Sequence, residues 1–325
     1  MDFTGIEMAS GGSRGGSWEE PTRCSNAFLK ETGLDWTVEA RPLHVNVVDE
    51  YGNPREVGCD EDVGHFRRNE GDSRVYLGAT GPGYELFQNH EAMELLEAVC
   101  GESGAEPLKG GSKNDGKFCW LQARMPENLK ILDGDEVEQL FTLFWGHGGS
   151  ASIQAGGTAH RMTCLNLLPM VRRDMKGTAF FKIRHTTSMK ARIADAVKAL
   201  HRTSEAFEEF GKAARAMATI RFDGARWSNL VEELVPLPKE GRATRALNIR
   251  ERLNDLYHTG QGAHIPGVYG TGWGAWNAVT EYTTHERSTS GEGEVQRLNR
   301  EYASLRGSGE AINKKAAHVI LRYAA

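Results

Sequence analysis

Hydrophobic and polar positions alternate with a period of two over much of the first half of this chain. Leu43, Val45 and Val47 point one way and His44 and Asn46 the other, before a Tyr-Gly-Asn-Pro turn. This alternation is typical of a half-buried strand that enters a hairpin. Further strands are predicted in the later segments, which are residues 74–87, 117–125, 139–147, 148–168 and 177–188. The segment 139–147 is apolar on both faces, as in a covered strand.

Two stretches of the first half have helical spacing instead. A short helix is predicted at residues 25–30, stopped near Gly33. A longer helix is predicted from the apolar positions between Ala92 and Val99, with Asn89 as its N-cap and Gly101 at its end.

The second half changes to a period near 3.6. Apolar positions between Met189 and Met217 recur at steps of three, four and seven, which predicts one long amphipathic helix from Ser188. Asp223 is the expected cap of the next helix. Later helices are predicted at residues 242–260, 271–285 and 294–305, and the remaining residues are expected to form a short tail.

These patterns predict an α+β fold, an antiparallel β meander with an inserted helix, followed by a long amphipathic helix and a helical C-terminal half. We expect three parts in one continuous fold. Residues 1–33 would be a mobile N-terminal tail and short helix, residues 34–187 a β-rich acidic part, and residues 188–325 a helical basic part.

Composition narrows the class of protein. Hydrophobic residues make up 39% and charged residues 26%, which is typical of soluble globular proteins. No apolar run approaches the roughly 18 residues of a spanning helix, and the N-terminus lacks the layout of a signal peptide. We therefore expect a cytoplasmic protein without membrane contact. The five cysteines are scattered and never form a CxxC pair, so reduced thiols are expected rather than disulfides or a zinc site.

Charge is distributed unevenly along the chain. Residues 1–168 hold 14 Lys and Arg against 27 Asp and Glu, and residues 169–325 hold 25 against 17, within a net charge of -5. This split indicates either a basic binding surface on an otherwise acidic protein or chance composition.

The most basic segment alternates cations with aromatic residues. Phe180, Lys182 and Arg184 fall on one face of a predicted strand, and further cations flank it at Arg172, Arg173, Lys190 and Arg192. Cations can follow phosphates, and aromatic rings can stack on bases, as single-stranded nucleic acid requires. The alternative is a solvated edge strand protected by charge.

A second candidate lies on the predicted helix at residues 271–285. Its polar face carries Trp273, Asn277, Glu281 and His285, and Asn277–Glu281 and Glu281–His285 can hydrogen-bond at i,i+4. A carboxylate beside an imidazole could form an acid/base pair or two metal ligands. The sequence nominates no further ligand, so no metal is assigned. The alternative is a polar face that orders a neighbouring loop or lies at an interface.

Other motifs favour structural roles. The Gly-rich stretch before Trp273 lacks the pattern of a nucleotide-binding P-loop, and no cofactor is expected. His147 and Ser150 are interpreted as part of a turn. Two acidic groups, Asp49/Glu50 and Asp60/Glu61/Asp62, are interpreted as solvated charge in a polar loop region.

Several blocks together resemble a known family. They are GLDWTVEARPL, YELFQNHEAMELLEAV, GHGGSAS with the following TCLNLL, KIRHTTSMKARI and GWGAWNAVTEY. This order is similar to the phage/plasmid-like protein family, domain of unknown function 932, over about residues 33–305. One departure is Phe144-Trp145-Gly146, where polar residues are expected before the Gly-rich turn.

The resemblance implies an accessory protein of mobile elements. A β meander followed by a long helix is also used by single-strand annealing proteins, which hold DNA in a basic groove and assemble into rings or filaments; this link is analogy at the level of fold. The leading hypothesis is a phage or plasmid DNA-metabolism protein of the bacterial host cytoplasm that binds single-stranded DNA, with strand annealing as a candidate activity, and forms a homo-oligomer. Two alternatives remain: an enzyme with a site around Asn277, Glu281 and His285, and a host-interaction protein that acts by protein contacts.

Overall fold

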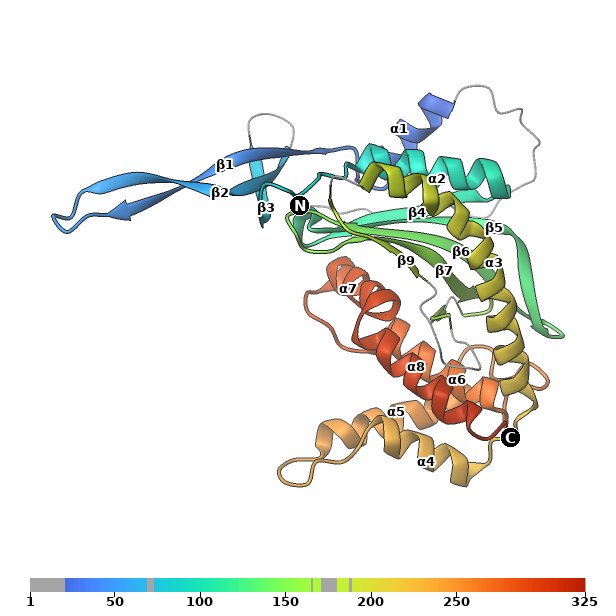
Figure 1. The fold of residues 1–325 in the computed structure, drawn as a ribbon. Helices are drawn as coiled ribbons and strands as arrows, with labels where there is room; N and C mark the ends of the chain where they lie inside the picture. Colours follow the sequence, from blue (N-terminus) through green and yellow to red (C-terminus); the bar gives the residue numbers. More distant parts are fainter. Residues whose placement is uncertain (1–20, 69–72, 165, 171–179, 187–188, 325) are drawn as a thin grey trace. The chain divides into compact units, whose positions relative to one another are not determined.

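The computed structural model describes residues 21–68, 73–164, 166–170, 180–186 and 189–324 (Figure 1). The tail expected at residues 1–20 lies outside these ranges. In the described part the fold is α+β, as predicted, with antiparallel sheets followed by helices. Within the same part, no helix is long and apolar enough to cross a membrane.

The chain forms two compact units that interleave along the sequence. Unit 1 comprises residues 1–124, 141–156 and 180–200, and unit 2 comprises residues 125–140, 157–179 and 201–325. The predicted parts, residues 34–187 and 188–325, follow the change of secondary structure along the sequence and stay a prediction. Several long elements contribute residues to both units, and such a division cannot be read from local patterns.

Unit 1 begins with helix α1 and a three-stranded antiparallel sheet. The elements are α1 (Pro21–Glu31), β1 (Thr37–Val48), β2 (Pro54–Arg68) and β3 (Arg74–Thr80), with the strand order β1-β2-β3. The predicted hairpin joins β1 to β2. In its turn, the carboxylate of Asp49 accepts hydrogen bonds from the N–H groups of Tyr51 and Asn53 at 2.9 and 2.8 Å, so Asp49 has a local structural role.

The acidic segment Asp60–Asp62 lies in strand β2, and its assignment to a polar loop was wrong. Pro42 pairs with Val63 and Leu43 pairs with Cys59, so the three intervening residues of β2 bulge out of the ladder. Pro42 has no N–H group to donate to the ladder, and a bulge beside it is expected because proline in a sheet is usually found at such irregularities.

Helix α2 (Asn89–Ser103) is the predicted inserted helix, but Asn89 is not its cap. Gln88 is the N-cap residue, and its N–H donates to the carboxylate of Glu91 at 2.7 Å. The buried Asn89 side chain donates to the carbonyl of Leu34 at 3.0 Å and accepts from the indole N–H of Trp145 at 3.1 Å. Tertiary partners therefore occupy the amide that was expected to cap the helix.

A six-stranded antiparallel sheet follows. Its strands are β4 (Glu106–Lys113), β5 (Phe118–Leu132), β6 (Asp135–Gly146), β7 (Ile153–Arg161), β8 (Asn166–Leu168) and β9 (Phe180–Ile183). The order is β4-β5-β6-β7-β8, and β9 also pairs with β7. The short helical turn η1 (Asn114–Gly116) joins β4 to β5. Residues 140–146 of β6 are buried without interruption, which confirms the covered strand.

Helices make up the rest of the described chain. They are α3 (Met189–Thr219), α4 (Gly224–Leu234), α5 (Thr244–Thr259), α6 (Gly272–Glu281), the π-helical turn η2 (Tyr282–Glu286), α7 (Gly293–Arg306) and α8 (Ser308–Leu321). Asp223 caps α4 as predicted, accepting from the N–H of Arg226 at 3.0 Å. The expected short C-terminal tail was wrong: α8 places Ala316 and Ile320, four residues apart, in the core with no exposed surface.

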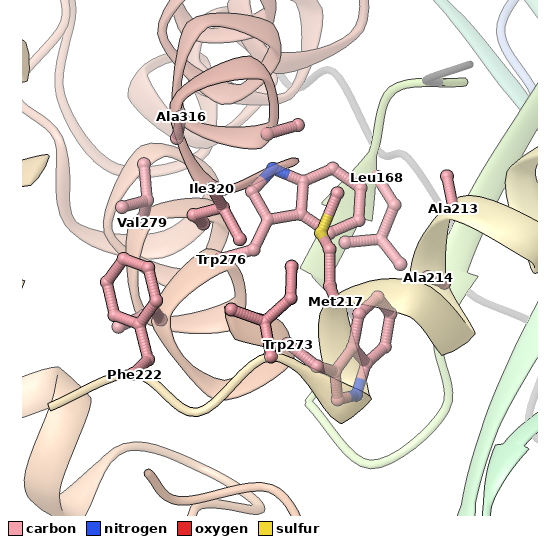
Figure 2. Close-up of a cluster of buried hydrophobic side chains, with 14 of the residues drawn as sticks. Leu168, Ala213, Ala214, Met217, Phe222, Trp273, Trp276, Val279, Ala316 and Ile320 are labelled. Carbon is pink, nitrogen blue, oxygen red and sulfur yellow. The ribbon is translucent and has the colours of Figure 1, made fainter. Parts of the chain in front are cut away.

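The core of unit 2 forms around helix α6, and Figure 2 shows Trp273 and Trp276 among side chains from the neighbouring elements. All residues of α6 are buried, so its predicted polar face is covered as well as its apolar face. A Cβ atom on Gly272 would lie 2.5 Å from Cγ2 of Ile320. The glycine at this position of the Gly-rich stretch therefore permits close helix packing.

Candidate functional site

The predicted nucleic-acid segment comprises strand β9 and Arg184, the residue directly after the last residue of that strand. Lys182 and Arg184 are exposed, whereas Ile183 and His185 between and after them are buried. Ile183 pairs with Ile153 of β7 and Lys182 pairs with Gln154. The predicted alternation of this segment is confirmed, and it presents two positive charges to solvent.

The other residues predicted for this interface are only partly placed. Arg172 and Arg173 lie outside the described residues. Phe180 begins strand β9, and Lys190 and Arg192 lie in the first turn of α3, but the structure gives no account of these three side chains. The structure therefore groups Lys182 with Arg184, and the remaining contacts stay predictions.

The second candidate site is built into the loop that precedes α6. Thr271 caps this helix, accepting from the N–H of Gly274 at 3.2 Å. At the other end, both carboxylate oxygens of Glu281 accept from the N–H of Gln261 at 3.1 and 3.2 Å. Burial raises the pKa of Glu281, while the hydrogen bond from Gln261 opposes that shift. Glu281 thus orders a neighbouring loop, as the structural interpretation expects.

Asn277 and His285 have partners other than Glu281. The side-chain amide of Asn277 donates to the carbonyl of Trp273 at 2.8 Å. Nε2 of His285 donates to the carbonyl of Cys164 at 2.9 Å, since a carbonyl can only accept. The expected i,i+4 ladder is therefore replaced by bonds to main-chain groups, and no acid/base pair forms between Glu281 and His285 in the structure.

Trp273 leads to a buried ion pair that the sequence did not reveal. Its indole N–H donates to Asp135 at 2.7 Å, and Nε and Nη2 of Arg161 each donate to the same carboxylate at 2.7 Å. Asp135 and Arg161 have no exposed surface. Burial alone would lower the pKa of Arg161, but the hydrogen bond with Asp135 and neighbouring groups raise it, so the guanidinium stays charged.

Arg161 and Glu281 bind the same loop, Arg161 through its carbonyl groups and Glu281 through an N–H group. Arg161 donates to the carbonyls of Gln261 and Gly262 at 3.1 and 3.3 Å, and Glu281 accepts the N–H of Gln261. Buried charges are tolerated when they are paired and hydrogen-bonded in this way. These hydrogen bonds fix the Gly-rich segment between α5 and α6. The side chains of Arg161 and Glu281 therefore have a structural role.

Nucleophilic chemistry at His147 and Ser150 has no support in the geometry. The hydroxyl of Ser150 donates to the carbonyls of Lys117 and His147, not to an imidazole nitrogen. Nε2 of His147 contacts Oδ1 of Asn89 at 3.2 Å. Burial lowers the pKa of His147 to about 3, so the ring is neutral at pH 7. The pair belongs to a turn, as predicted.

A metal site would need several His, Cys, Asp or Glu side chains close together. Among the described residues, no cluster of three or more His, Cys, Asp or Glu side chains is placed to hold a metal ion. The cysteines whose side chains are described, Cys59, Cys100, Cys119 and Cys164, are free thiols. In the described part of the chain, the polar groups around Asp135, Arg161 and Glu281 have structural partners, and Lys182 and Arg184 are exposed cations.

Comparison with protein families shows which family this is. A family described as "Domain of unknown function (DUF932)" matches residues 76–305. The chain belongs to the DUF932 family. No curated protein matches it significantly, and no solved structure does.

The DUF932 match places both candidate sites inside the family region. Strand β9, the Asp135–Arg161 pair and helix α6 all fall within residues 76–305. The match begins at residue 76 rather than near residue 33, so strands β1 and β2 lie outside it, and helix α8 lies beyond its end at residue 305. Features outside the match belong to this chain without being assigned to the family.

Proposed function

We propose that this DUF932 protein binds single-stranded DNA in the metabolism of a phage or plasmid, with strand annealing as its activity. The observation that carries the proposal is the exposed cation pair at the end of β9, where Lys182 in the strand and Arg184 just after it flank the buried Ile183. Side chains two residues apart on a strand lie about 7 Å from one another. Both cations can therefore contact one stretch of phosphate backbone. Phe180 is the predicted stacking residue.

The setting rests on the resemblance to phage- and plasmid-associated proteins, and the bacterial host cytoplasm is proposed on the same ground. The basic C-terminal half of the sequence supports an anionic partner. An enzymatic site at Glu281 is not proposed, because its carboxylate is bound by the N–H of Gln261 and is buried.

Fluorescence anisotropy with a labelled 40-nucleotide strand tests the proposal. We expect salt-sensitive binding that favours the single strand over the duplex and persists without Mg²⁺, followed by annealing of complementary strands. An absence of binding to either form at low salt would contradict it.

A matched pair of double variants separates a specific surface from general charge. Lys182→Gln/Arg184→Gln removes one lysine and one arginine at the end of β9, and Lys239→Gln/Arg242→Gln removes the same pair from an exposed loop after α4. We expect only the first pair to weaken binding. Equal effects of the two variants would mean that net charge, rather than this strand, attracts the DNA.

We also propose that the β1–β2 hairpin forms the contact of a homo-oligomer. Val45 and Val57 pair across the hairpin, with Val47 on the same face, and these side chains are 47%, 38% and 43% exposed. An exposed apolar strand face of this kind marks a contact surface, and a hairpin alone is marginally stable in water. Light scattering after size-exclusion chromatography should show a smaller species for Val45→Thr/Val47→Thr. An unchanged mass would contradict this contact.

A further inference from the structure

Unit 2 contains a half-open pocket with apolar walls. Its volume is about 740 Å³, within the range of roughly 300–1,000 Å³ that small-molecule sites usually have. Side chains from α4, α5, α6 and α8 and from the residue after α4 supply the walls, which are Leu234, Val235, Ile249, Leu253, Val279 and Ile312. An apolar cavity of this size suits the body of a small organic molecule.

The rim of the pocket is positively charged. Arg245, Arg252 and Arg287 line it together with a single acid, Glu286. Both terminal oxygens of Glu286 accept hydrogen bonds from Arg252, so these two charges compensate each other. Arg287 donates to the hydroxyl of Ser308 at 2.7 Å, which orients its guanidinium without neutralising it. Two of the three lining arginines therefore keep their positive charge for another partner.

Arg245 is the more available of these two arginines. It is exposed at the start of α5, and no hydrogen bond or ion pair joins it to another residue within the described ranges. Tyr282 is half-buried and lines the pocket together with Arg245 and Arg287. Burial raises the pKa of Tyr282, and the two guanidinium groups oppose that rise. One polar corner thus combines a phenol with two cations beside apolar walls.

This combination selects among ligand classes. A neutral molecule would give the two guanidinium groups no counter-charge, and a cation would be repelled by them. A highly charged polyphosphate would have nothing to place against six aliphatic side chains. A small molecule with one apolar body and one anionic group satisfies both parts of the pocket.

We propose that this pocket binds a small amphipathic anion, a carboxylate or phosphate ester whose apolar body lies against Ile249 and Ile312 and whose anionic group is held by Arg245 and Arg287. The site is separate from β9 and goes beyond DNA binding. Failure of either idea would therefore leave the other standing.

The probe for the experiment is 8-anilinonaphthalene-1-sulfonate, whose fluorescence rises in an apolar site. N-phenyl-1-naphthylamine has the same rings without the sulfonate and serves as the neutral comparison. Both are titrated into the full chain and into the variants Arg245→Gln, Arg245→Glu and Ile312→Trp. The control variants Arg242→Gln and Arg242→Glu change an exposed arginine three residues away that does not line the pocket. Unfolding temperature is measured for every variant.

The expected result is graded. Arg245→Gln should weaken sulfonate binding by about threefold and Arg245→Glu by about tenfold, at the scale of one charge-assisted hydrogen bond. The neutral probe and the Arg242 variants should change little, and Ile312→Trp should weaken both probes by filling the pocket. Unchanged sulfonate binding in Arg245→Glu, or in Ile312→Trp with an unchanged unfolding temperature, would overturn the proposal.

Displacement of the bound sulfonate then distinguishes the two natural forms of the anion. Decanoate represents carboxylates, decyl phosphate represents phosphate esters, and decanol has the same chain without charge. At least one of the two anions should displace the probe at a concentration well below that of decanol. Equal displacement by all three would show that the charge of the ligand does not contribute to binding, and would overturn the assignment of Arg245 and Arg287.

Discussion

Replacing Asp135 with Asn tests whether the buried ion pair stabilises unit 2. Asp135 and Arg161 have no exposed surface, and two hydrogen bonds of 2.7 Å join them. The same carboxylate accepts the indole N–H of Trp273. An amide of equal size removes the negative charge and turns one of the two acceptors into a donor, so Arg161 is left charged in the interior.

The size of the effect follows from this geometry. Removing one partner of a buried ion pair costs about 3–5 kcal/mol, because the remaining charge stays desolvated. We expect about 3 kcal/mol, at the lower end of that range, because Arg161 keeps the carbonyls of Gln261 and Gly262 as acceptors. With a urea dependence of roughly 3 kcal/mol per molar, the unfolding midpoint of unit 2 should fall by about 1 M.

Tryptophan fluorescence during urea unfolding measures this shift. Asp133→Asn is the matched control. It removes the same negative charge two residues earlier in the sequence, where the Asp133 side chain is 96% exposed. The control should leave the midpoint unchanged. Asp135→Leu/Arg161→Met should recover part of the loss, since it removes both buried charges, while the indole N–H of Trp273 loses its acceptor. A midpoint for Asp135→Asn equal to that of the control would refute the stabilising role of the pair.

Two further predictions concern the segment around α6. In Gly274→Ala the new methyl group would collide with the carbonyl oxygen of Val268. We expect this variant to lose about 1–3 kcal/mol of unfolding free energy. The control Gly224→Ala, at a helix position with open space, should lose none. Burial raises the pKa of Glu281 in the folded state above its ordinary value of 4.5, so the folded state binds protons more tightly. The contribution of Glu281 to stability should therefore fall as pH rises from about 4.5 through the raised pKa. Glu281→Gln should remove that decline in urea titrations at pH 5 and pH 7, and identical pH dependence in the two proteins would contradict the shift.

Local patterns predicted most elements because their causes are local. Alternation identified β9, with Ile183 buried between the exposed Lys182 and Arg184. It also identified β1 as a strand, but the expected half-buried face was wrong, because residues 44–48 are exposed on both faces. Helical spacing identified α3, and the aspartate at position 223 marked the start of α4. The C-terminal helix α8 was overlooked, although Ala316 and Ile320 have helical spacing.

The polar centre of unit 2 could not be predicted because its members are distant in sequence. Asp135 and Arg161 lie on separate strands, and Trp273 reaches them from a helix 138 positions after Asp135. Nothing in the local pattern distinguishes this aspartate from the solvated Asp133 two residues earlier. Asn89 was misassigned as a helix cap for the same reason, since its partner Trp145 lies 56 positions away.

The salt dependence of single-stranded DNA binding tests the central proposal most directly. Binding of the labelled 40-nucleotide strand is measured at several salt concentrations for the unaltered protein, Lys182→Gln/Arg184→Gln and Lys239→Gln/Arg242→Gln. Each phosphate contact contributes about 0.7 to the slope of log affinity against log salt for single strands. We expect the slope of the β9 variant to flatten by about 1.4, with the loop variant unchanged. Equal slopes in all three proteins would contradict the assignment of Lys182 and Arg184 as the DNA-binding face.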